Sequence, residues 1–294
     1  MIHYSQCPIC SSPKIALSLS AKDFTVTKEN FPIWKCKDCS LQFTQDVPEQ
    51  SAIGKYYQSE AYISHSDTKE GIINKLYHSV RKFTLSNKRK LIFSQTKKQK
   101  GNILDVGCGT GAFLNTMKET GWSITGLEPD EQAAQNAKSL YNIDTQSSDQ
   151  LFNLPANSFD AITMWHVLEH VHQLQEYIAQ LKKLLTKNGV LFIAVPNYTS
   201  HDAAHYKESW AAYDVPRHLY HFSPESMKVL IEKHGMNIKA IKPMWYDSFY
   251  VSMLSEKCKH DKNNIIKAFF IGFISNCIAL FDKKKCSSVI YVIG

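Results

Sequence analysis

The chain has 294 residues, of which 44% are apolar, and its 34 basic and 27 acidic side chains give a net charge of +7. This apolar fraction argues against a disordered chain, because it is enough for the core of one large domain with a small additional module. The modest positive charge is compatible with an anionic ligand but does not by itself indicate binding to nucleic acid. The first residues, MIHYSQCPIC, lack a basic stretch followed by an apolar run, so we expect no secretory signal and a cytoplasmic protein.

Four of the eight cysteines form two close pairs near the N-terminus, CPIC at 7–10 and CKDC at 36–39. Each turn directs two thiolates at one point, and two such turns form a tetrahedral four-thiolate site that suits zinc. Without a secretory signal this grouping favours metal over disulfides. We predict that residues 1–50 form a zinc ribbon whose structural zinc is bound by Cys7, Cys10, Cys36 and Cys39.

Residues 51–100 have no proline and few glycines, so we predict a helical linker or cap. Its second half is rich in lysine and arginine. That basic face could lie over a phosphate-bearing substrate or nucleic acid, but a solvated helix surface is the favoured interpretation. Tyr56, Tyr57 and Tyr62 are candidates to cover one side of a substrate cleft.

The segment beginning ILDVGCGTGAFLNTMKETG at 103 has the order strand, glycine turn, helix. Gly107, Gly109 and Gly111 would let a ligand approach the backbone, next to the unpaired N–H groups of a helix N-terminus. The G-x-G-x-G spacing differs from the dinucleotide pattern G-x-G-x-x-G, and no Gly-Lys-Ser/Thr follows as in a P-loop. Asp105, inside the strand, would repel a pyrophosphate but suits an ammonium group.

The next strand, SITGLEPD, ends in Glu128, 23 residues after Asp105. An acid at this place can accept hydrogen bonds from both hydroxyls of a ribose. A cationic amino acid combined with a ribose describes S-adenosylmethionine (SAM).

These motifs resemble those of the class I SAM-dependent methyltransferases, and the resemblance covers roughly residues 100–294. ILDVGCGTG is similar to the family's first motif, GLEPD to its second, and NSFDAITMWHVLEHV to its fourth-strand region. The resemblance implies that SAM is the cofactor. Its expected contacts are Asp105, Gly107, Gly109, Gly111, Glu128, Asp149, Gln150 and Trp165.

Later segments continue the alternation of strands and helices. FDAITMW, VLFIAVPN, NIKAIKPMW and SSVIYVIG are typical of strands, and LQEYIAQLKKLLTKNG and SPESMKVLIEKHG of helices. This order predicts an α/β, doubly wound, Rossmann-like sheet covered on both faces. The family resemblance adds a seven-stranded sheet whose last strand is antiparallel, so we expect a methyltransferase domain at 101–294.

One insertion, at 197–222, is rich in histidine, tyrosine and tryptophan and follows the end of the fifth predicted strand of that sheet. Ligands of open α/β sheets bind over the carboxyl ends of the strands, so we predict a lid over the substrate. Within it, YDVPRHLYHFS resembles a segment of small-molecule members of the family and points to substrate contacts at Tyr213, Asp214 and Arg217. A polar loop packed by its own aromatic residues is the alternative.

A second insertion, at 246–286, contains the apolar run NNIIKAFFIGFISNCIALFD. An apolar stretch of about 18 residues is short for a membrane span, which must cross roughly 30 Å of hydrocarbon. We therefore expect helices packed on the lid or in a dimer. Docking of 264–281 on a membrane surface, or a channel for an apolar substrate, is the alternative.

The stretch WHVLEH at 165–170 contains the His-x-x-Glu-His pattern of one class of zinc peptidases. A peptidase would need this pattern within a helix, whereas here it begins where a predicted strand ends, so we do not expect that activity. His166 lies at the strand edge toward which the methyl group should point. We predict His166 as the general base and His218 as the second candidate, with a packing or orienting role as the alternative for each.

A metal site is an alternative interpretation of the same stretch. In ubiquinone-pathway O-methyltransferases a similar Glu-x-x-Glu-His arrangement is associated with a divalent ion. The resemblance would place such an ion at His166, Glu169 and His170, and the alternative is that Glu169 and His170 cap and orient the start of a helix.

Together these features predict a SAM-dependent O- or C-methyltransferase acting on a small molecule. A sugar nucleotide or another glycoconjugate or lipid precursor is the favoured acceptor, because a zinc ribbon and lid resemble those of sugar methyltransferases. An RNA-modifying methyltransferase, with the ribbon and basic helix bound to phosphates, is the main alternative. The sequence contains neither the Asn/Asp-Pro-Pro-aromatic motif nor the paired catalytic cysteines that an RNA base methylase would often show. A non-catalytic binding module that retains the cofactor is the third hypothesis.

Overall fold

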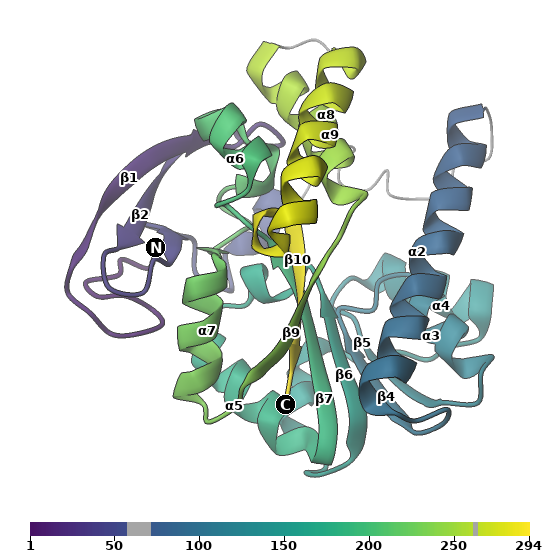
Figure 1. The fold of residues 1–294 in the computed structure, drawn as a ribbon. Coiled ribbons are helices and arrows are strands. Elements are labelled where there is room, and N and C mark those ends of the chain that lie inside the picture. The colour runs from purple at the N-terminus through teal and green to yellow at the C-terminus, as the bar shows by residue number, and fades with distance from the viewer. Residues whose placement is uncertain (58–71, 261–263) are drawn as a thin grey trace. The chain divides into compact units, whose positions relative to one another are not determined.

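The computed structural model describes residues 1–57, 72–260 and 264–294. Tyr62 and most of the first half of the predicted linker lie outside these residues. Figure 1 shows the described elements in chain order.

The larger of two sheets has six strands in the order β5-β4-β6-β7-β10-β9. The strands, in chain order, are β4 (Asn102–Val106), β5 (Ser123–Leu127), β6 (Phe159–Trp165), β7 (Leu185–Pro196), β9 (Ile238–Pro243) and β10 (Ser288–Ile293). β4 pairs in parallel with both β5 and β6. The predicted α/β, Rossmann-like fold class is therefore confirmed.

The last strand lies between β7 and β9 rather than at an edge. Asn197, just after β7, donates its backbone N–H to Ser287 at the start of β10, and Met244, just after β9, donates to Ser288. β10 thus begins where β7 and β9 end, which makes it antiparallel to both, as the family resemblance predicted.

The structure places six strands in this sheet among the described residues, not the seven that the resemblance predicted. A further strand beside β5 is reduced to one parallel bridge between Leu127 and Gln146. Only residues 143–147 separate Asn142, the left-handed C-cap of helix α4 (Glu131–Tyr141), from the 3-10 helix η2 (Ser148–Asn153). The chain turns away before a full strand can form.

A second, antiparallel sheet has the order β1-β2-β3-β8. Its strands are β1 (Ile15–Lys22), β2 (Asn30–Cys36), β3 (Gln42–Thr44) and β8 (Tyr220–His221). The first three come from the predicted zinc ribbon, whereas β8 comes from the predicted lid and pairs Tyr220 with Phe43. The lid therefore completes the sheet of the ribbon.

The chain forms two compact units, 1–65 with 168–175 and 194–291, and 66–167 with 176–193 and 292–294. The first contains the ribbon and the segments after β7, and the second contains the glycine loop with its neighbouring strands. The predicted boundaries 1–50, 51–100 and 101–294 stay a prediction. Pairing of β3 with β8 joins the ribbon to a strand of the predicted methyltransferase domain.

The remaining elements of the unit with the glycine loop are helices. They are α2 (Ile72–Thr96), α3 (Ala112–Lys118) and α5 (Leu174–Leu184), with α4 and η2 named above. Part of the predicted helical linker is thus present as α2, which packs on α3.

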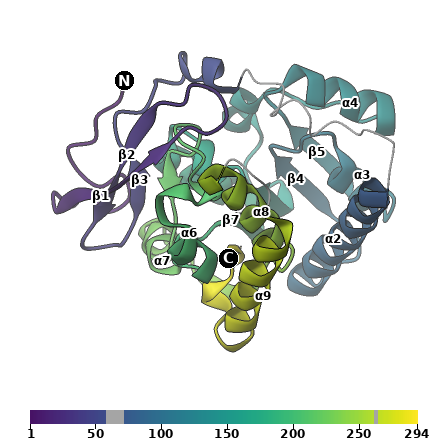
Figure 2. The ribbon, with the colours of Figure 1, turned by 90° about the horizontal axis from the view of Figure 1, so that it is seen from above.

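The unit with the ribbon contains the other helices. They are η1 (Ile53–Tyr57), η3 (Leu168–His170), α6 (His201–Tyr206), η4 (Lys207–Ser209), η5 (Ala211–Tyr213), α7 (Pro224–Lys233), α8 (Asp247–His260), α9 (Ile265–Phe281) and η6 (Lys283–Lys285). The predicted start of α7 is confirmed, because Ser223 forms a capping box with Ser226 and Pro224 opens the helix. Figure 2 shows α8 and α9 side by side, as their many contacts require.

A buried carboxylate joins three parts of this unit. Asp202, at the start of α6, accepts hydrogen bonds from Trp210 Nε1, Ser275 Oγ of α9 and Ser287 Oγ, at 2.8, 2.8 and 2.7 Å. The lid, α9 and the residue before β10 are thereby fixed around one fully buried acceptor.

We predict that Asp202→Ala lowers the free energy of unfolding by about 3 kcal/mol, because three buried donors lose their acceptor at once. Chemical denaturation monitored by tryptophan fluorescence measures the change. The matched control is Asp144→Ala, whose side chain is 81% exposed and pairs with Lys138; it should cost less than about 0.5 kcal/mol. Equal losses in the two variants would contradict a structural role for the Asp202 centre.

Candidate functional site

The glycine turn after β4 adopts a backbone that favours glycine. Gly107, Gly109 and Gly111 have φ of 69°, 56° and 75°. A Cβ at Gly107 would come within 2.5 Å of Val167 Cγ2, whereas a Cβ at Gly109 would meet no atom within 4 Å. The turn therefore leaves open space at its middle glycine, which is the cradle that a bound cofactor needs.

The two predicted acidic cofactor contacts lie beside this turn. Glu128 follows β5, and its Oε2 accepts the Gly109 N–H at 2.7 Å while Oε1 accepts the Asp130 N–H at 3.0 Å. Burial raises the pKa of Glu128. Asp105, inside β4, is buried and accepts a hydrogen bond from Thr163 Oγ1 at 2.5 Å.

Burial is also the main reason that the pKa of Asp105 rises to about 7, although the Thr163 hydroxyl and the nearby Lys88 ammonium oppose the rise. A carboxyl with this pKa is partly protonated near neutrality. An arriving ammonium group would favour its ionised form, so binding of the amino-acid end of SAM would be coupled to loss of a proton.

Three further predicted cofactor residues surround the same turn. Trp165 ends β6, lies 5.5 Å edge-to-face from Phe113, and has Lys88 Nζ 4.1 Å from its ring centre. Asp149 and Gln150 lie in η2, which follows the bridge beside β5 and contacts that strand. The structure thus gathers all eight predicted cofactor residues in one unit, at the ends of β4, β5 and β6.

The sequence did not single out two cationic residues of α2 that lie against this site. Arg81 donates to Thr110 Oγ1 in the glycine turn at 3.2 Å, and Lys88 lies over Trp165. The basic character of the linker was the available signal. Part of that basic face points to the glycine turn rather than to solvent.

His166 follows β6 directly and is half-buried, with a left-handed φ of 58°. The next residue, Val167, packs against Gly107 of the turn. His166 therefore lies at a sharp corner next to the glycine turn and outside any helix, as the sequence predicted, which excludes the mid-helix arrangement of the peptidase motif.

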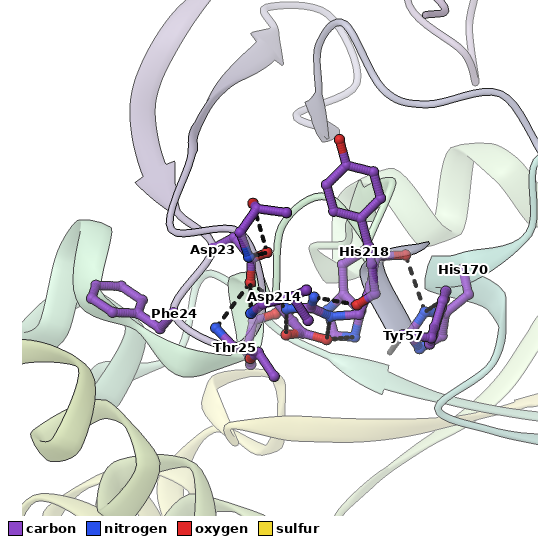
Figure 3. A network of polar contacts seen from close by, with 12 residues as sticks. Asp23, Phe24, Thr25, Tyr57, His170, Asp214 and His218 are labelled. Atoms are coloured by element: carbon purple, nitrogen blue, oxygen red, sulfur yellow. Dashed lines mark hydrogen bonds and ion pairs between the residues drawn. The ribbon is translucent and has the colours of Figure 1, made fainter. Parts of the chain in front are cut away.

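His218 lies in the other unit, in a polar cluster drawn in Figure 3. Its Nδ1 lies 2.8 Å from the carbonyl oxygen of Ala212, which can only accept, so Nδ1 carries a proton, and in the neutral form of the ring Nε2 holds the lone pair. The ring centre of His170 is 4.6 Å away. Nδ1 of His170 likewise donates to the Arg217 carbonyl at 3.1 Å and lies 3.1 Å from Tyr57 Oη.

Burial lowers the pKa of His170 to about 4, and the neighbouring His218 lowers it further. His170 is therefore neutral at pH 7, with its Nε2 available as a base or ligand. Burial raises the pKa of Tyr57, so its hydroxyl stays protonated. Tyr57 was expected to cover a cleft; the structure places it as a polar neighbour of His170 (Figure 3).

Arg217 holds this cluster together. Its guanidinium donates to both oxygens of Asp214 at 2.7 and 3.0 Å, to Asp23 at 2.9 Å and to the Tyr56 carbonyl at 2.8 Å. Its side chain is 0% exposed. These contacts favour a structural role for Arg217 and Asp214 over the predicted contact with an anionic substrate. Tyr213 is also buried, with its hydroxyl 3.5 Å from Gln42.

Asp23 is a further member of this cluster, and no motif in the sequence indicated it. Its carboxylate accepts the backbone N–H groups of Thr25, Val26 and Thr27 as well as the Arg217 guanidinium. Burial alone would raise its pKa, but Arg217 and these amides lower it to about 2. An aspartate directly before a turn was the available signal for the local bonds, but nothing in the sequence pointed to Arg217.

Among the described residues, two groups place their potential metal ligands within 4.8 Å of one another. The first is the predicted set Cys7, Cys10, Cys36 and Cys39. Here the Sγ atoms of Cys7 and Cys39 are 3.4 Å apart and those of Cys10 and Cys36 are 3.6 Å apart. Sulfurs about 2.3 Å from a common zinc would be separated by nearly this distance, so the residues fit zinc.

The second group contains Glu169, His170 and His218. It differs from the predicted metal set, because His218 of the lid takes the place of His166. The corner after β6 turns the chain between His166 and η3, so the spacing in the sequence did not decide which histidine joins Glu169 and His170.

The sheet order with an antiparallel strand between two others, the open glycine turn, and the acids Asp105 in β4 and Glu128 after β5 define a class I SAM-dependent methyltransferase. The comparisons agree. Residues 78–241, more than half of the chain, match the family model described as "Methyltransferase domain", and the chain belongs to this family. The predicted class of enzyme, a SAM-dependent methyltransferase, is confirmed at the level of family.

Curated relatives of the chain are named as methyltransferases. The ubiquinone biosynthesis O-methyltransferase of Rattus norvegicus is 29% identical over 163 residues, which cover 50% of this chain and 47% of the relative. A demethylmenaquinone methyltransferase of Tropheryma whipplei is 27% identical over 162 residues, 53% of this chain and 64% of the relative. The chain spans about half the length of the mitochondrial ubiquinone biosynthesis O-methyltransferases that it matches.

Solved structures share the fold. A SAM-dependent methyltransferase from Archaeoglobus fulgidus has a TM-score of 0.51 at 21% identity, covering 72% of this chain and 93% of that one. Magnesium protoporphyrin IX methyltransferase from Synechocystis, with bound SAH, also scores 0.51 at 14% identity, covering 66% of this chain and 92% of that one. At these identities the likeness supports the fold only.

We predict that the affinity for S-adenosylhomocysteine (SAH), which keeps the amino group but cannot react, falls about fivefold from pH 7 to pH 6. Protonation of Asp105 below its pKa of about 7 removes the negative charge that the ammonium group needs. Titration calorimetry across this range measures the effect. Asp105→Asn should bind weakly with little pH dependence, and a wild-type affinity that is constant over this range would contradict the assignment.

We also predict that Cys36→Ser lowers the zinc content by one ion per chain and destabilises the ribbon, because a four-thiolate site loses a ligand. Elemental analysis of the purified protein measures the difference. Cys277→Ser, which changes a half-buried cysteine of α9, is the matched control and should leave the zinc content unchanged. An unaltered zinc content in Cys36→Ser would refute the four-cysteine site.

Proposed function

We propose that the protein transfers a methyl group from SAM to an oxygen or carbon atom of a small molecule. The observation that carries the proposal is the glycine turn, with an open space at Gly109 between the acids Asp105 and Glu128. When bound, SAM supplies an electrophilic methyl group on a sulfonium. Asp105 would hold its ammonium group, and Glu128 would exchange its bond with the Gly109 N–H for bonds from the ribose.

A small acceptor is supported by the curated relatives, whose names refer to ubiquinone and demethylmenaquinone methylation. The aromatic, histidine-rich lid, which packs on the ribbon, also supports a small acceptor. A buried and largely fixed segment suits the wall of a pocket for a small molecule better than a surface that binds an extended polymer. Within this class we propose a sugar nucleotide or another glycoconjugate or lipid precursor.

We further propose His166 as the general base that removes the acceptor's proton. It lies at the end of β6 beside the glycine turn, in the unit that contains every proposed cofactor contact. His218 is the second candidate, since its Nδ1–H bond to Ala212 leaves Nε2 as the basic nitrogen and Asp214 lies 4.0 Å from that atom.

The direct test incubates the protein with methyl-labelled SAM and a metabolite extract, followed by mass spectrometry and a parallel count of label in RNA. Label in a small molecule supports the proposal. Label found only in RNA would favour the alternative with the ribbon and α2 bound to phosphates, and SAH binding without any turnover would favour a non-catalytic module.

Once an acceptor is found, we predict that His166→Ala lowers kcat by about 10²-fold to 10⁴-fold while the affinity for SAH changes less than about threefold. A base acts on the acceptor and not on the bound cofactor, so the two effects should separate. His218→Ala is tested alongside, and the variant with the larger loss of kcat identifies the base. His3→Ala, an exposed histidine of the ribbon, is the control. Full activity in His166→Ala with normal SAH binding would reject His166.

A further inference from the structure

Helix α9 has the reverse of the usual amphipathic pattern. Its buried face carries only small residues, which are Ala268, Gly272, Ser275 and Ala279. Most of its large apolar residues are exposed instead, whereas Ile271 is half-buried against the core: Ile265, Ile266, Phe269, Phe270, Phe273, Ile274, Ile278, Leu280 and Phe281 are the exposed ones. Ile266 is 73% and Phe281 94% exposed. Exposed apolar side chains gathered along one helix mark a surface that binds a partner.

The helix cannot turn this face inward without losing its packing. A Cβ at Gly272 would lie 2.9 Å from a Phe249 ring carbon and 3.0 Å from the Ser248 carbonyl of α8. Ser275 also donates to the buried Asp202 carboxylate at 2.8 Å. Close approach to α8 and a buried hydrogen bond thus fix which side of α9 faces outward.

Aromatic residues extend the exposed face. Phe269 stacks on Phe249 of α8 at 5.3 Å and on Phe273 at 6.4 Å. Tyr246 and Tyr250, at the start of α8, are 41% and 47% exposed. Phenylalanine inside an apolar stripe with tyrosine beside it is the composition of helices that lie in a membrane interface.

Lysine residues lie at both ends of the stripe. Lys257 and Lys259 are exposed at the end of α8, and Lys283, Lys284 and Lys285 are exposed directly after α9. The described acids from Asp247 to Lys285 are Asp247, Glu256 and Asp282, and of these Glu256 is buried and paired with Lys267 at 2.9 Å. The exposed charge around the apolar face is therefore positive.

We propose that α9 and the neighbouring lysines dock the protein on the surface of an anionic lipid bilayer, with the helix lying in the plane of the interface. The apolar stripe would enter the acyl boundary, and the lysines at its two ends would contact anionic headgroups. No helix of the described residues is long and apolar enough to cross a membrane. With 17 residues, α9 extends over roughly 26 Å, which suits a helix lying flat.

A second copy of the chain fits this face less well. A symmetric contact would bring the same surface of two chains together, and both ends of the stripe carry lysines. In either helix direction, the five exposed lysines would then face lysines of the second chain, and the exposed Asp282 would neutralise them only in part. The charge pattern favours anionic lipid, and this inference does not depend on the methyl acceptor.

The test is co-sedimentation of the full chain with sucrose-loaded phosphatidylcholine vesicles that contain or lack about 30% phosphatidylglycerol. We expect binding to the anionic vesicles that weakens at high salt. Ile266→Ser/Phe270→Ser should weaken it at least about tenfold, because two exposed apolar side chains no longer enter the lipid. Lys283→Glu/Lys284→Glu should also weaken it, through reversal of charge.

Two matched controls separate the patch from general surface effects. Leu140→Ser/Phe152→Ser changes two exposed apolar residues of α4 and η2, and Lys97→Glu/Lys100→Glu changes two exposed lysines outside α8 and α9. Both should bind vesicles as the wild type does. Near-ultraviolet circular dichroism confirms that each variant is folded.

The absence of wild-type binding to anionic vesicles would overturn the proposal. So would equal losses in the controls. Sedimentation velocity supplies a further outcome: a wild-type dimer that becomes monomeric in Ile266→Ser/Phe270→Ser, without vesicle binding, would show that a second copy covers this face instead.

Discussion

The buried guanidinium of Arg217 is the interaction on which the unit containing the ribbon depends. A cation without solvent contact is stable only if its donors are satisfied by well-placed acceptors. Here Asp214 supplies a bidentate partner, Asp23 a second carboxylate and Tyr56 a carbonyl. These partners come from the lid, the ribbon and η1, so one side chain joins three segments that are distant in the sequence.

The polar cluster around Arg217 follows from this arrangement. Its own carbonyl accepts the Nδ1–H of His170, and the adjacent His218 is held through Ala212, so both histidines have their Nδ1 protons fixed. Burial keeps His170 neutral. The cluster therefore offers two imidazoles of defined tautomer, which can act as bases or ligands without first rearranging.

Asp23 and Asp105 show how surroundings separate two carboxyls of the same type. Both are buried, and burial alone raises the pKa of each. A guanidinium and three backbone amides lower the pKa of Asp23 to about 2, whereas a single hydroxyl and a more distant lysine leave that of Asp105 near 7. The first is a permanent charge in a structural centre. The second is poised to change its charge when a cation arrives, which is what a binding site for an ammonium group requires.

The sequence by itself determined the class of fold and the glycine turn at which we propose that the cofactor binds, because these depend on local order. A strand, a G-x-G-x-G turn and a helix are adjacent in the chain, and Glu128 reaches the turn through the pairing of neighbouring strands. The two C-x2-C turns likewise bring their cysteines together through short hairpins. Tertiary structure alone decided the partners of Arg217, the choice of His218 over His166 beside Glu169 and His170, and the pairing of the lid strand β8 with the ribbon. It also decided which face of α9 is exposed, since an apolar run of residues carries no sign of the side on which small residues will be needed for close packing. Each of these depends on contacts between segments far apart in the chain, and local patterns in a single sequence do not encode them.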